Sequence, residues 1–334
     1  MRTLLDVEQL SVRFRGGDGV VWALDEMAFT LAEGEILALV GESGCGKTVT
    51  GLSILGLLPP AGEVVSGTVA FDGRNLLKMP GAELRRIRGK EIAMVFQEPM
   101  SSLDPVYPIK QQIGEVLRRH EGLSRRAARQ RSLELLDLVR IPDPERRLDQ
   151  YPHQLSGGMR QRVVIAIAIA CGPKVLIADE PTTALDVTIQ AGILDTMREL
   201  RERLGTAIIL ITHDLGVVAD IADRVAVLYA GRKVEEGDVH QLFANAQHPY
   251  TIGLLGAVPN PLTATDGAAD NRRLREIPGI VPTLSGPAGS CMFAPRCPRG
   301  DDRCRGERPV LGPGTPGQLV ACFHPGPRRA EVSG

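Results

Sequence analysis

The sequence predicts an α/β fold built on a mostly parallel β-sheet, and three observations support this prediction. Short apolar runs typical of buried strands alternate with longer stretches that are apolar at helical spacing. A glycine-rich loop at residues 41–48 joins one of these strands to a helix. A later apolar strand ends in two carboxylates, Asp179 and Glu180, about 130 residues after the loop. Together these features indicate a site for a phosphorylated ligand on an α/β core.

The elements follow from local pattern. Strands are expected at residues 4–14, 22–31, 35–40, 67–71, 91–96, 174–178, 207–211 and 224–229. Helical periodicity predicts helices at residues 47–58, 108–120, 124–140, 156–171 and 249–258. Residues 99–171 are therefore expected to be helical, with strands on either side, and a compact segment at 231–237 to close the α/β pattern. We find no internal repeat.

Composition limits the function classes. The chain has 334 residues, 43% of them hydrophobic, and a formal net charge of -1, so it has ample core and no electrostatic reason to bind nucleic acid. The basic outward face of residues 124–140 is most simply a solvated surface, with nucleic-acid contact the less favoured interpretation. The longest apolar run, Val163 to Cys171, is about half of what a membrane span needs. We expect no secretory signal, and membrane association only through a partner.

The loop Gly41-Glu42-Ser43-Gly44-Cys45-Gly46-Lys47-Thr48 fits the pattern G-x-x-x-x-G-K-[ST]. Its glycines let backbone N–H groups approach a polyphosphate, Lys47 supplies a point charge, and Thr48 offers a hydroxyl to Mg²⁺. The helix that follows adds a favourable dipole. A glycine turn without a ligand is the alternative, but the strand before and the helix after favour nucleotide binding.

Two further motifs can act on a nucleotide. In such a site Asp179 would hold Mg²⁺ through its water shell, and Glu180 would polarise the attacking water as general base. On its own this is weak, because strands often end in acids. Leu155-Ser-Gly-Gly-Met159 places two glycines beside a serine at a helix start, a second anion-binding terminus. A head-to-tail pair of chains would use both cradles, whereas an ordinary serine cap is the simpler alternative.

The motifs resemble, in order and spacing, those of ABC transporter ATPases. They are Gly41 to Thr48, Gln97, Leu155 to Met159, Asp179-Glu180, Ala184-Leu185-Asp186 and His213. The resemblance covers roughly residues 4–240. It implies a P-loop NTPase cassette, that is, a RecA-like core with an antiparallel β-subdomain and a helical subdomain at about 98–172. It also implies two ATP molecules sandwiched between two such subunits.

The resemblance assigns roles within the chain. Thr48 and Gln97 would complete the Mg²⁺ shell, and Glu180 would be the general base. His213 would contact the γ-phosphate, its alternative being a surface histidine before a helix start. Phe14 stands where the family places an aromatic ring against adenine, although a core strand residue is nearly as good an interpretation.

It also assigns roles across the dimer. Ser156 and Gly158, with Gly157 and Met159 in the same motif, would reach the γ-phosphate of the partner's ATP, and Asp186 would cross the interface. The family usually has glutamine where this chain has Met159, but that side chain is not the main phosphate contact. This departure does not imply an inactive site, and with both Glu180 and His213 present we expect hydrolysis.

The remaining quarter of the chain is predicted to be an appended region, with an ATPase domain at 1–246 and the extension at 247–334. His248-Pro-Tyr-Thr and the spacing Cys291-x5-Cys297-x6-Cys304-x17-Cys322 resemble the C-terminal region of oligopeptide/dipeptide importer ATPases. Four thiols can ligate one metal centre, and on ligand type zinc and iron–sulfur are equally suitable. The family resemblance favours a [4Fe–4S] cluster over Zn²⁺ or free thiols.

Three other residues bear on this chemistry. His324 is an alternative fourth ligand. Cys45 and Cys171 are expected to be structural, with Cys45 placed where thiol reagents could inhibit the ATPase.

The resemblance implies an ATP-hydrolysing subunit that energises import of di- and oligopeptides from the cytoplasmic face of the inner membrane. Its expected partners are a second, homologous ATPase chain, two transmembrane permease subunits and, indirectly, an extracytoplasmic peptide-binding protein, with no nucleic acid. Nickel, glutathione or a sugar are alternative solutes, and a soluble ABC ATPase is less favoured. The interval of about 58 residues from Gln97 to Leu155 carries no heptads, which argues against that last class.

Overall fold

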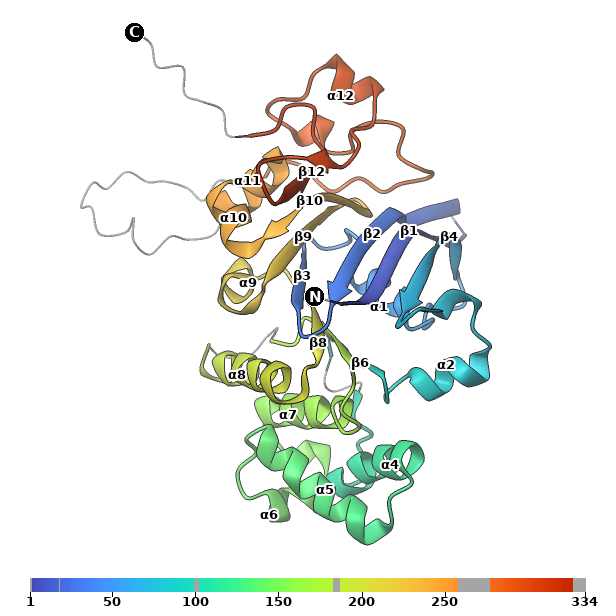
Figure 1. Ribbon diagram of the computed structural model, residues 1–334, viewed down its shortest axis with the longest axis vertical. Coiled ribbons are helices and arrows are strands. Elements are labelled where there is room, and N and C mark those ends of the chain that lie inside the picture. The colour runs from blue at the N-terminus through green and yellow to red at the C-terminus, as the bar shows by residue number, and fades with distance from the viewer. Residues whose placement is uncertain (1, 18, 99–101, 183–186, 258–276, 327–334) are drawn as a thin grey trace, which may run out of the picture.

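The computed structural model of the protein describes residues 2–17, 19–98, 102–182, 187–257 and 277–326. Two β-sheets form its centre, a lobe of helices lies at one end, and the C-terminal part of the chain lies at the other (Figure 1). Among the described residues, no helix is both long enough and apolar enough to cross a bilayer.

The smaller sheet is antiparallel and has four strands in the order β2-β1-β4-β5. They are β1 (Thr3–Gly16), β2 (Gly19–Ala32), β4 (Gly62–Phe71) and β5 (Arg74–Asn75). β1 and β2 form a long hairpin interrupted by bulges. The expected strands are confirmed, but β4 begins five residues earlier than the sequence indicated, because Gly62 to Val64 continue the pairing with β1.

The larger sheet has eight strands in the order β11-β12-β10-β9-β3-β8-β7-β6. They are β3 (Ile36–Val40), β6 (Ile92–Val95), β7 (Val175–Asp179), β8 (Ala207–Thr212), β9 (Arg224–Tyr229), β10 (Arg232–Asp238), β11 (Gly312–Pro313) and β12 (Gln318–Val320). The five strands from β9 to β6 are parallel, so their carboxyl ends share one edge, with Val40 beside Thr212 and Asp179 beside Ile211. The predicted parallel sheet is confirmed, and this edge brings together the ends of β3, β6, β7 and β8.

The helices are α1 (Lys47–Ile54), α2 (Gly81–Ile87), α4 (Ile109–Glu121), α5 (Arg125–Leu138), α6 (Pro144–Leu148), α7 (Gly157–Ala168), α8 (Val187–Leu204), α9 (Leu215–Ile221), α10 (Val239–Ala244), α11 (Pro249–Gly256) and α12 (Asp302–Gly306). Short 3-10 turns lie at η1 (Leu76–Lys78), η2 (Pro152–Gln154) and η4 (Ala294–Arg296). α1 ends four residues earlier than expected, since Gly56 adopts a left-handed conformation (φ 60°) that terminates it.

The helical lobe consists of α4 to α7, as the periodicity predicted (Figure 1). Serine caps start two of its helices: Ser124 Oγ accepts the Ala127 N–H at α5, and Ser156 Oγ accepts the Met159 N–H at α7. Apolar residues at helical spacing, among them Leu117 and Leu136, are fully buried between the helices.

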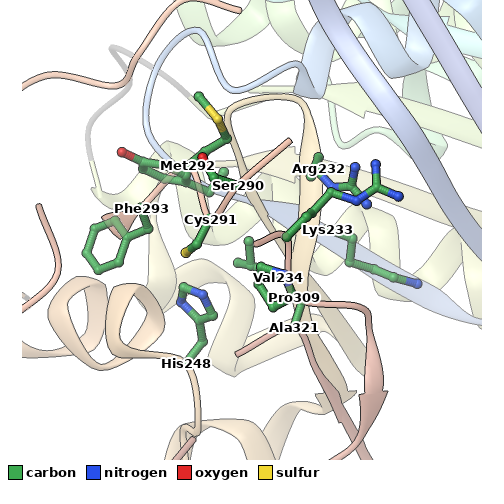
Figure 2. A pocket seen from close by; sticks show the side chains of 12 residues that line it. Arg232, Lys233, Val234, His248, Ser290, Cys291, Met292, Phe293, Pro309 and Ala321 are labelled. Atoms are coloured by element: carbon green, nitrogen blue, oxygen red, sulfur yellow. The ribbon is translucent and has the colours of Figure 1, made fainter. Parts of the chain in front are cut away.

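The C-terminal part packs onto the end of the larger sheet. β12 pairs with β10 from Glu235–Val320 to Gly237–Gln318, which makes the compact segment expected at 231–237 a regular strand. Figure 2 shows Cys291 and Phe293 beside His248, where a small cavity of about 30 Å³ remains. The division at 246/247 stays a prediction, since residues on both sides of it contribute to one packed layer.

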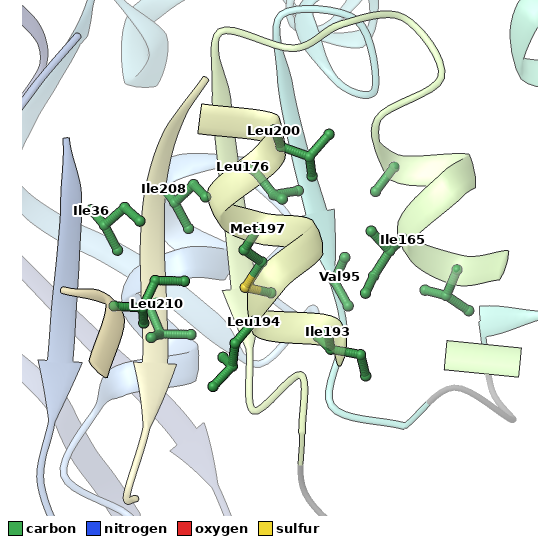
Figure 3. Packing of buried hydrophobic residues seen from close by; sticks show 14 of the residues in the cluster. Ile36, Val95, Ile165, Leu176, Ile193, Leu194, Met197, Leu200, Ile208 and Leu210 are labelled. Atoms are coloured by element: carbon green, nitrogen blue, oxygen red, sulfur yellow. The ribbon is translucent and has the colours of Figure 1, made fainter. Parts of the chain in front are cut away.

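Two apolar clusters lie on opposite faces of the parallel sheet. Alternate residues of β3 face opposite sides: Ile36, Ala38 and Val40 belong to one cluster and Leu37 and Leu39 to the other. On the first side α8 lays Leu194, Met197 and Leu200 over β7 and β8, as Figure 3 shows. These side chains are at most 4% exposed, and each contributes about 1.5–3 kcal/mol by burial.

Candidate active site

The loop between β3 and α1 requires its glycines. Gly41, Gly44 and Gly46 have φ values of 153°, 80° and 101°, a region that other residues rarely adopt. A Cβ on Gly41 would lie 2.3 Å from the Leu228 carbonyl oxygen, and one on Gly46 would lie 2.7 Å from that of Ala23. Two of the three motif glycines are therefore required for two reasons: their φ values and the close approach of a neighbouring backbone.

Lys47 points into this loop. Its ammonium is bonded to the carbonyl oxygens of Gly41 at 2.7 Å and Glu42 at 3.0 Å, and the residue is only 6% exposed. Gly46, the cap residue of α1, offers no side chain to the first amides of the helix. The loop thus combines a held cation with uncapped N–H groups, which is the chemistry of a phosphate cradle.

Cys45 is buried, and this corrects one expectation. The thiol is 0% exposed, and burial raises its pKa above the ordinary value, a shift that the nearby Lys47 only partly offsets. A buried, protonated thiol reacts slowly, so the expected sensitivity of Cys45 to thiol reagents is not supported. The exposed residues of the loop are Ser43, Gly44 and Thr48.

The end of β7 places Asp179 beside the loop. Asp179 is 1% exposed, and burial raises its pKa, while a hydrogen bond from the Thr48 hydroxyl lowers it. Its Oδ1 has no hydrogen-bond partner among the described residues. An orphaned buried carboxylate oxygen next to a threonine hydroxyl fits a Mg²⁺ ion with its water shell, so the residues present suit the metal that the motif indicates.

Glu180 lies between the two other predicted catalytic residues. Its Oε2 accepts a hydrogen bond from Gln97 Nε2 at 2.9 Å, and its Oε1 lies 3.1 Å from His213 Nδ1. Its backbone φ is 46°, a strained value for a non-glycine residue, held by an N–H bond to the Ile211 carbonyl. The ends of β6, β7 and β8 thereby bring the three predicted catalytic side chains into contact.

The motif at Ser156 to Met159 belongs to a different element from the loop. It starts α7 in the helical lobe, and in the described part of the chain no hydrogen bond joins it to residues 41–48. Gly158 is explained by packing, since a Cβ there would lie 2.7 Å from two side-chain carbons of Ile189. Gly157 has open space around it. Asp186, with Ala184 and Leu185, lies outside the described residues.

Two aromatic residues are candidates for contact with a nucleotide base, and only Phe14 was predicted from the sequence. Phe14 is half-buried and its ring packs against Gly62, so its adenine role stays a prediction. Trp22, which the motifs did not single out, lines a hollow of about 510 Å³ together with Ser43 and Gly44. Its backbone N–H donates to the Leu284 carbonyl oxygen at 2.8 Å. Trp22 is the only tryptophan in the sequence, which could have marked it as a candidate site residue. Its position beside the loop follows only from the fold.

The four tail cysteines gather in one region. Cys304 is buried and Cys291, Cys297 and Cys322 are half-buried. Burial, with smaller effects from the other three thiols, raises the pKa of Cys322 to about 11. Backbone N–H groups of Arg299 and His324 point at the sulfurs of Cys297 and Cys322, at 3.4 and 3.3 Å. Among the described residues, no three of the four sulfurs lie within 4.8 Å of one another.

His324 lies near one thiol of that set, and its role as an alternative ligand stays a prediction. Its Nε2 lies 2.8 Å from Asp301 Oδ2, and the ligand atoms of Asp301, Cys304 and His324 lie within 4.8 Å of one another. Hydrogen bonds from the Cys304 backbone and thiol lower the pKa of Asp301 to about 2. Asp301 therefore connects His324 to Cys304.

Comparisons with known proteins agree with this geometry. The sequence profile of the ABC transporter family matches residues 24–183, and that of the oligopeptide/dipeptide transporter C-terminal region matches residues 234–304. A dimeric post-hydrolysis state of an ATP-binding cassette bound to ADP and Pi has a similar fold, with a TM-score of 0.65 and 28% identity, covering 71% of this chain and 99% of that chain. The predicted ABC cassette fold is thereby confirmed.

Curated relatives match almost the whole chain. A "probable peptide ABC transporter ATP-binding protein" of Sinorhizobium fredii is 52% identical over 96% of this chain and 94% of its own length. The dipeptide transport ATP-binding protein of Escherichia coli is 47% identical over 96% and 97%. The oligopeptide transport ATP-binding protein of Haemophilus influenzae is 48% identical over 97% and 98%. The chain therefore belongs to the ATP-binding proteins of the ABC transporter family, in the group that carries the oligopeptide/dipeptide transporter C-terminal region.

Proposed function

We propose that this chain hydrolyses ATP to energise the uptake of di- or oligopeptides through a membrane ABC importer. The observation that carries the catalytic part is Glu180, held at hydrogen-bond distance from both Gln97 and His213 at the strand edge that bears the phosphate loop. The peptide substrate rests on the relatives, whose names specify peptide, dipeptide and oligopeptide transport.

The chain's own residues divide the work of hydrolysis. Lys47 and the loop amides bind the phosphates, while Thr48, Gln97 and Asp179 would hold Mg²⁺, which neutralises phosphate charge. Glu180 takes a proton from the attacking water. The oxygen of that water bonds to the γ-phosphorus while the bond between the γ-phosphorus and the bridging oxygen of ADP breaks. His213 faces the γ-phosphate, and Gln97 orients Glu180.

The site is proposed to be completed by a second chain. Ser156 and Gly158 would reach the γ-phosphate held by a partner subunit, with Gly157 and Met159 in the same turn and Asp186 at the interface. A helix start that, among the described residues, makes no hydrogen bond to the chain's own loop supports this assignment. We infer a different, homologous ATPase as partner, because the family often pairs two such chains.

Two permease subunits would hold the dimer at the cytoplasmic face of the inner membrane, and an extracytoplasmic peptide-binding protein would act on them. No nucleic acid is expected.

The C-terminal region is proposed to hold a [4Fe–4S] cluster on Cys291, Cys297, Cys304 and Cys322. Zinc bound by four thiolates at about 2.3 Å needs sulfurs roughly 3.8 Å apart, closer than the spacing found here. A cubane with one thiolate per iron needs a wider set, and N–H groups directed at two of the sulfurs suit it. Brown protein after anaerobic purification would support the cluster; colourless protein with stoichiometric zinc would overturn it.

Peptide uptake tests the proposed function as a whole. Cells that lack the gene should fail to accumulate a labelled di- or oligopeptide, and the wild-type gene should restore uptake whereas Glu180→Gln should not. Uptake of a free amino acid serves as the control. Purification from membranes should recover the chain with two permeases and a second ATPase. Normal peptide uptake without the gene would contradict the substrate, and purification free of membrane proteins would contradict the assembly.

A further inference from the structure

One arginine of the C-terminal region reaches the phosphate loop. Arg296 lies at the end of η4, one residue before Cys297, and is 9% exposed. Its two terminal nitrogens bond the two carboxylate oxygens of Glu42, at 2.6 and 2.9 Å. The pair joins residues 254 positions apart in the sequence. No local pattern could have indicated it.

The rest of the guanidinium is also held. Its Nε donates to the Pro278 carbonyl oxygen at 2.7 Å, and one terminal nitrogen donates to that of Ile277 at 3.1 Å. The Tyr229 hydroxyl lies 3.3 Å from the other. These contacts hold the guanidinium in place independently of Glu42. Its bidentate pairing with the carboxylate both neutralises the charge of Glu42 and fixes the orientation of that side chain.

Glu42 is the one acidic residue of the phosphate loop. Its carbonyl accepts from Lys47, and its N–H donates to the Tyr250 hydroxyl at 2.8 Å. Its side chain is 29% exposed. A free carboxylate on a loop that must receive a polyphosphate would repel it, since like charges several ångströms apart interact strongly near a protein surface.

We propose that Arg296 is a positioning residue for ATP binding, which neutralises Glu42 and fixes it so that the phosphate loop can accept a polyphosphate. A partly buried ion pair is by itself weak evidence for a role in stability, so we base the inference on the position of this pair at the phosphate loop. Because Arg296 precedes Cys297, the fold of the cysteine region acts on the nucleotide site through this pair. The inference rests on nucleotide binding by this loop.

The test combines three variants of the full chain. Arg296→Met keeps the length of the side chain but removes its charge, and it should weaken binding of a fluorescent ATP analogue about tenfold. Glu42→Gln should bind within about twofold of wild type. The double variant should also return to within about twofold, because the charge that needed neutralising is gone. In turnover, the KM for ATP should rise in Arg296→Met while kcat stays unchanged.

Two further variants separate this role from folding. Arg308→Met removes another arginine that joins the same region to the core, through Glu26 at 2.9 Å, without touching the loop, and it should leave ATP affinity unchanged. Arg296→Lys keeps the charge without the fork and should lose less than threefold. Wild-type affinity in Arg296→Met, a double variant as weak as Arg296→Met, or an equal loss in Arg308→Met would each overturn the inference. A wild-type chain that fails to bind ATP would instead refute the proposed function.

Discussion

Two helix starts in this molecule carry glycines beside polar residues, yet they are built differently. α1 begins at Gly46 in a left-handed conformation with no side-chain cap, beside the buried Lys47. α7 begins at Ser156 in an extended conformation, with its hydroxyl accepting the Met159 N–H. The first is an enclosed cradle with its own cation and carboxylates, and the second is an ordinary cap on the helical lobe.

The difference is compatible with the divided site proposed above. A serine hydroxyl that accepts one N–H still has a proton to donate, so Ser156 can cap α7 and bind a phosphate at the same time. Under the proposed function, the loop half would bind and activate the nucleotide of its own chain, and the α7 half would complete the site of a partner chain.

The largest expected effect falls on the loop half. Glu180→Gln should lower the rate of ATP hydrolysis about a thousandfold, because it removes the proton acceptor while leaving a side chain able to bond Gln97. ATP affinity should stay near wild type. Turnover by phosphate release measures the first and equilibrium binding the second, and normal turnover would refute the general-base role.

The α7 half is tested with a matched pair of caps. Ser156→Ala and Ser124→Ala each remove a serine cap and should each lower the free energy of unfolding by about 1 kcal/mol. Only Ser156→Ala should slow hydrolysis, by about ten- to a hundredfold, because it also loses a hydrogen bond to a charged phosphate. Equal rates of hydrolysis in the two variants would show that Ser156 only caps α7.

The two glycines of α7 should separate in a stability measurement. Gly158→Ala forces a Cβ into Ile189 and should destabilise the protein by about 1–3 kcal/mol in denaturant unfolding. Gly157→Ala has open space and should leave stability unchanged or slightly raised. If the two variants unfold alike, packing does not explain Gly158.

The smallest expected effect concerns the buried charge of the loop half. Burial raises the pKa of Asp179 in the folded state, so ionised Asp179 opposes folding, and its contribution to stability is lost as pH rises through that pKa. Asp179→Asn should therefore raise the Tm by about 1–3 °C at pH 7 while impairing Mg²⁺-dependent hydrolysis. The increase in Tm should become smaller toward pH 4. An increase that does not change with pH would show that the buried charge of Asp179 is not its cause.

Sequence alone predicted the parts of this molecule that depend on local pattern. The loop, the strand that ends in Asp179 and Glu180, and the helical lobe follow from glycine spacing and apolar periodicity. It did not predict that Gly158 is required by Ile189, that Trp22 lies beside the loop, or that Arg296 pairs with Glu42. These contacts join residues that are far apart in the sequence and adjacent only in the folded chain. The pairing of β12 with β10 is of the same kind.

We propose that nucleotide joins the two halves from different chains. Light scattering on Glu180→Gln tests it directly, since this variant binds ATP without consuming it. We predict that Mg²⁺-ATP doubles the measured mass, alone or with the companion ATPase subunit, that ADP does not, and that adding Ser156→Ala weakens the association. A Glu180→Gln protein that stays monomeric with Mg²⁺-ATP, both alone and with the companion subunit, would contradict a site shared between two chains.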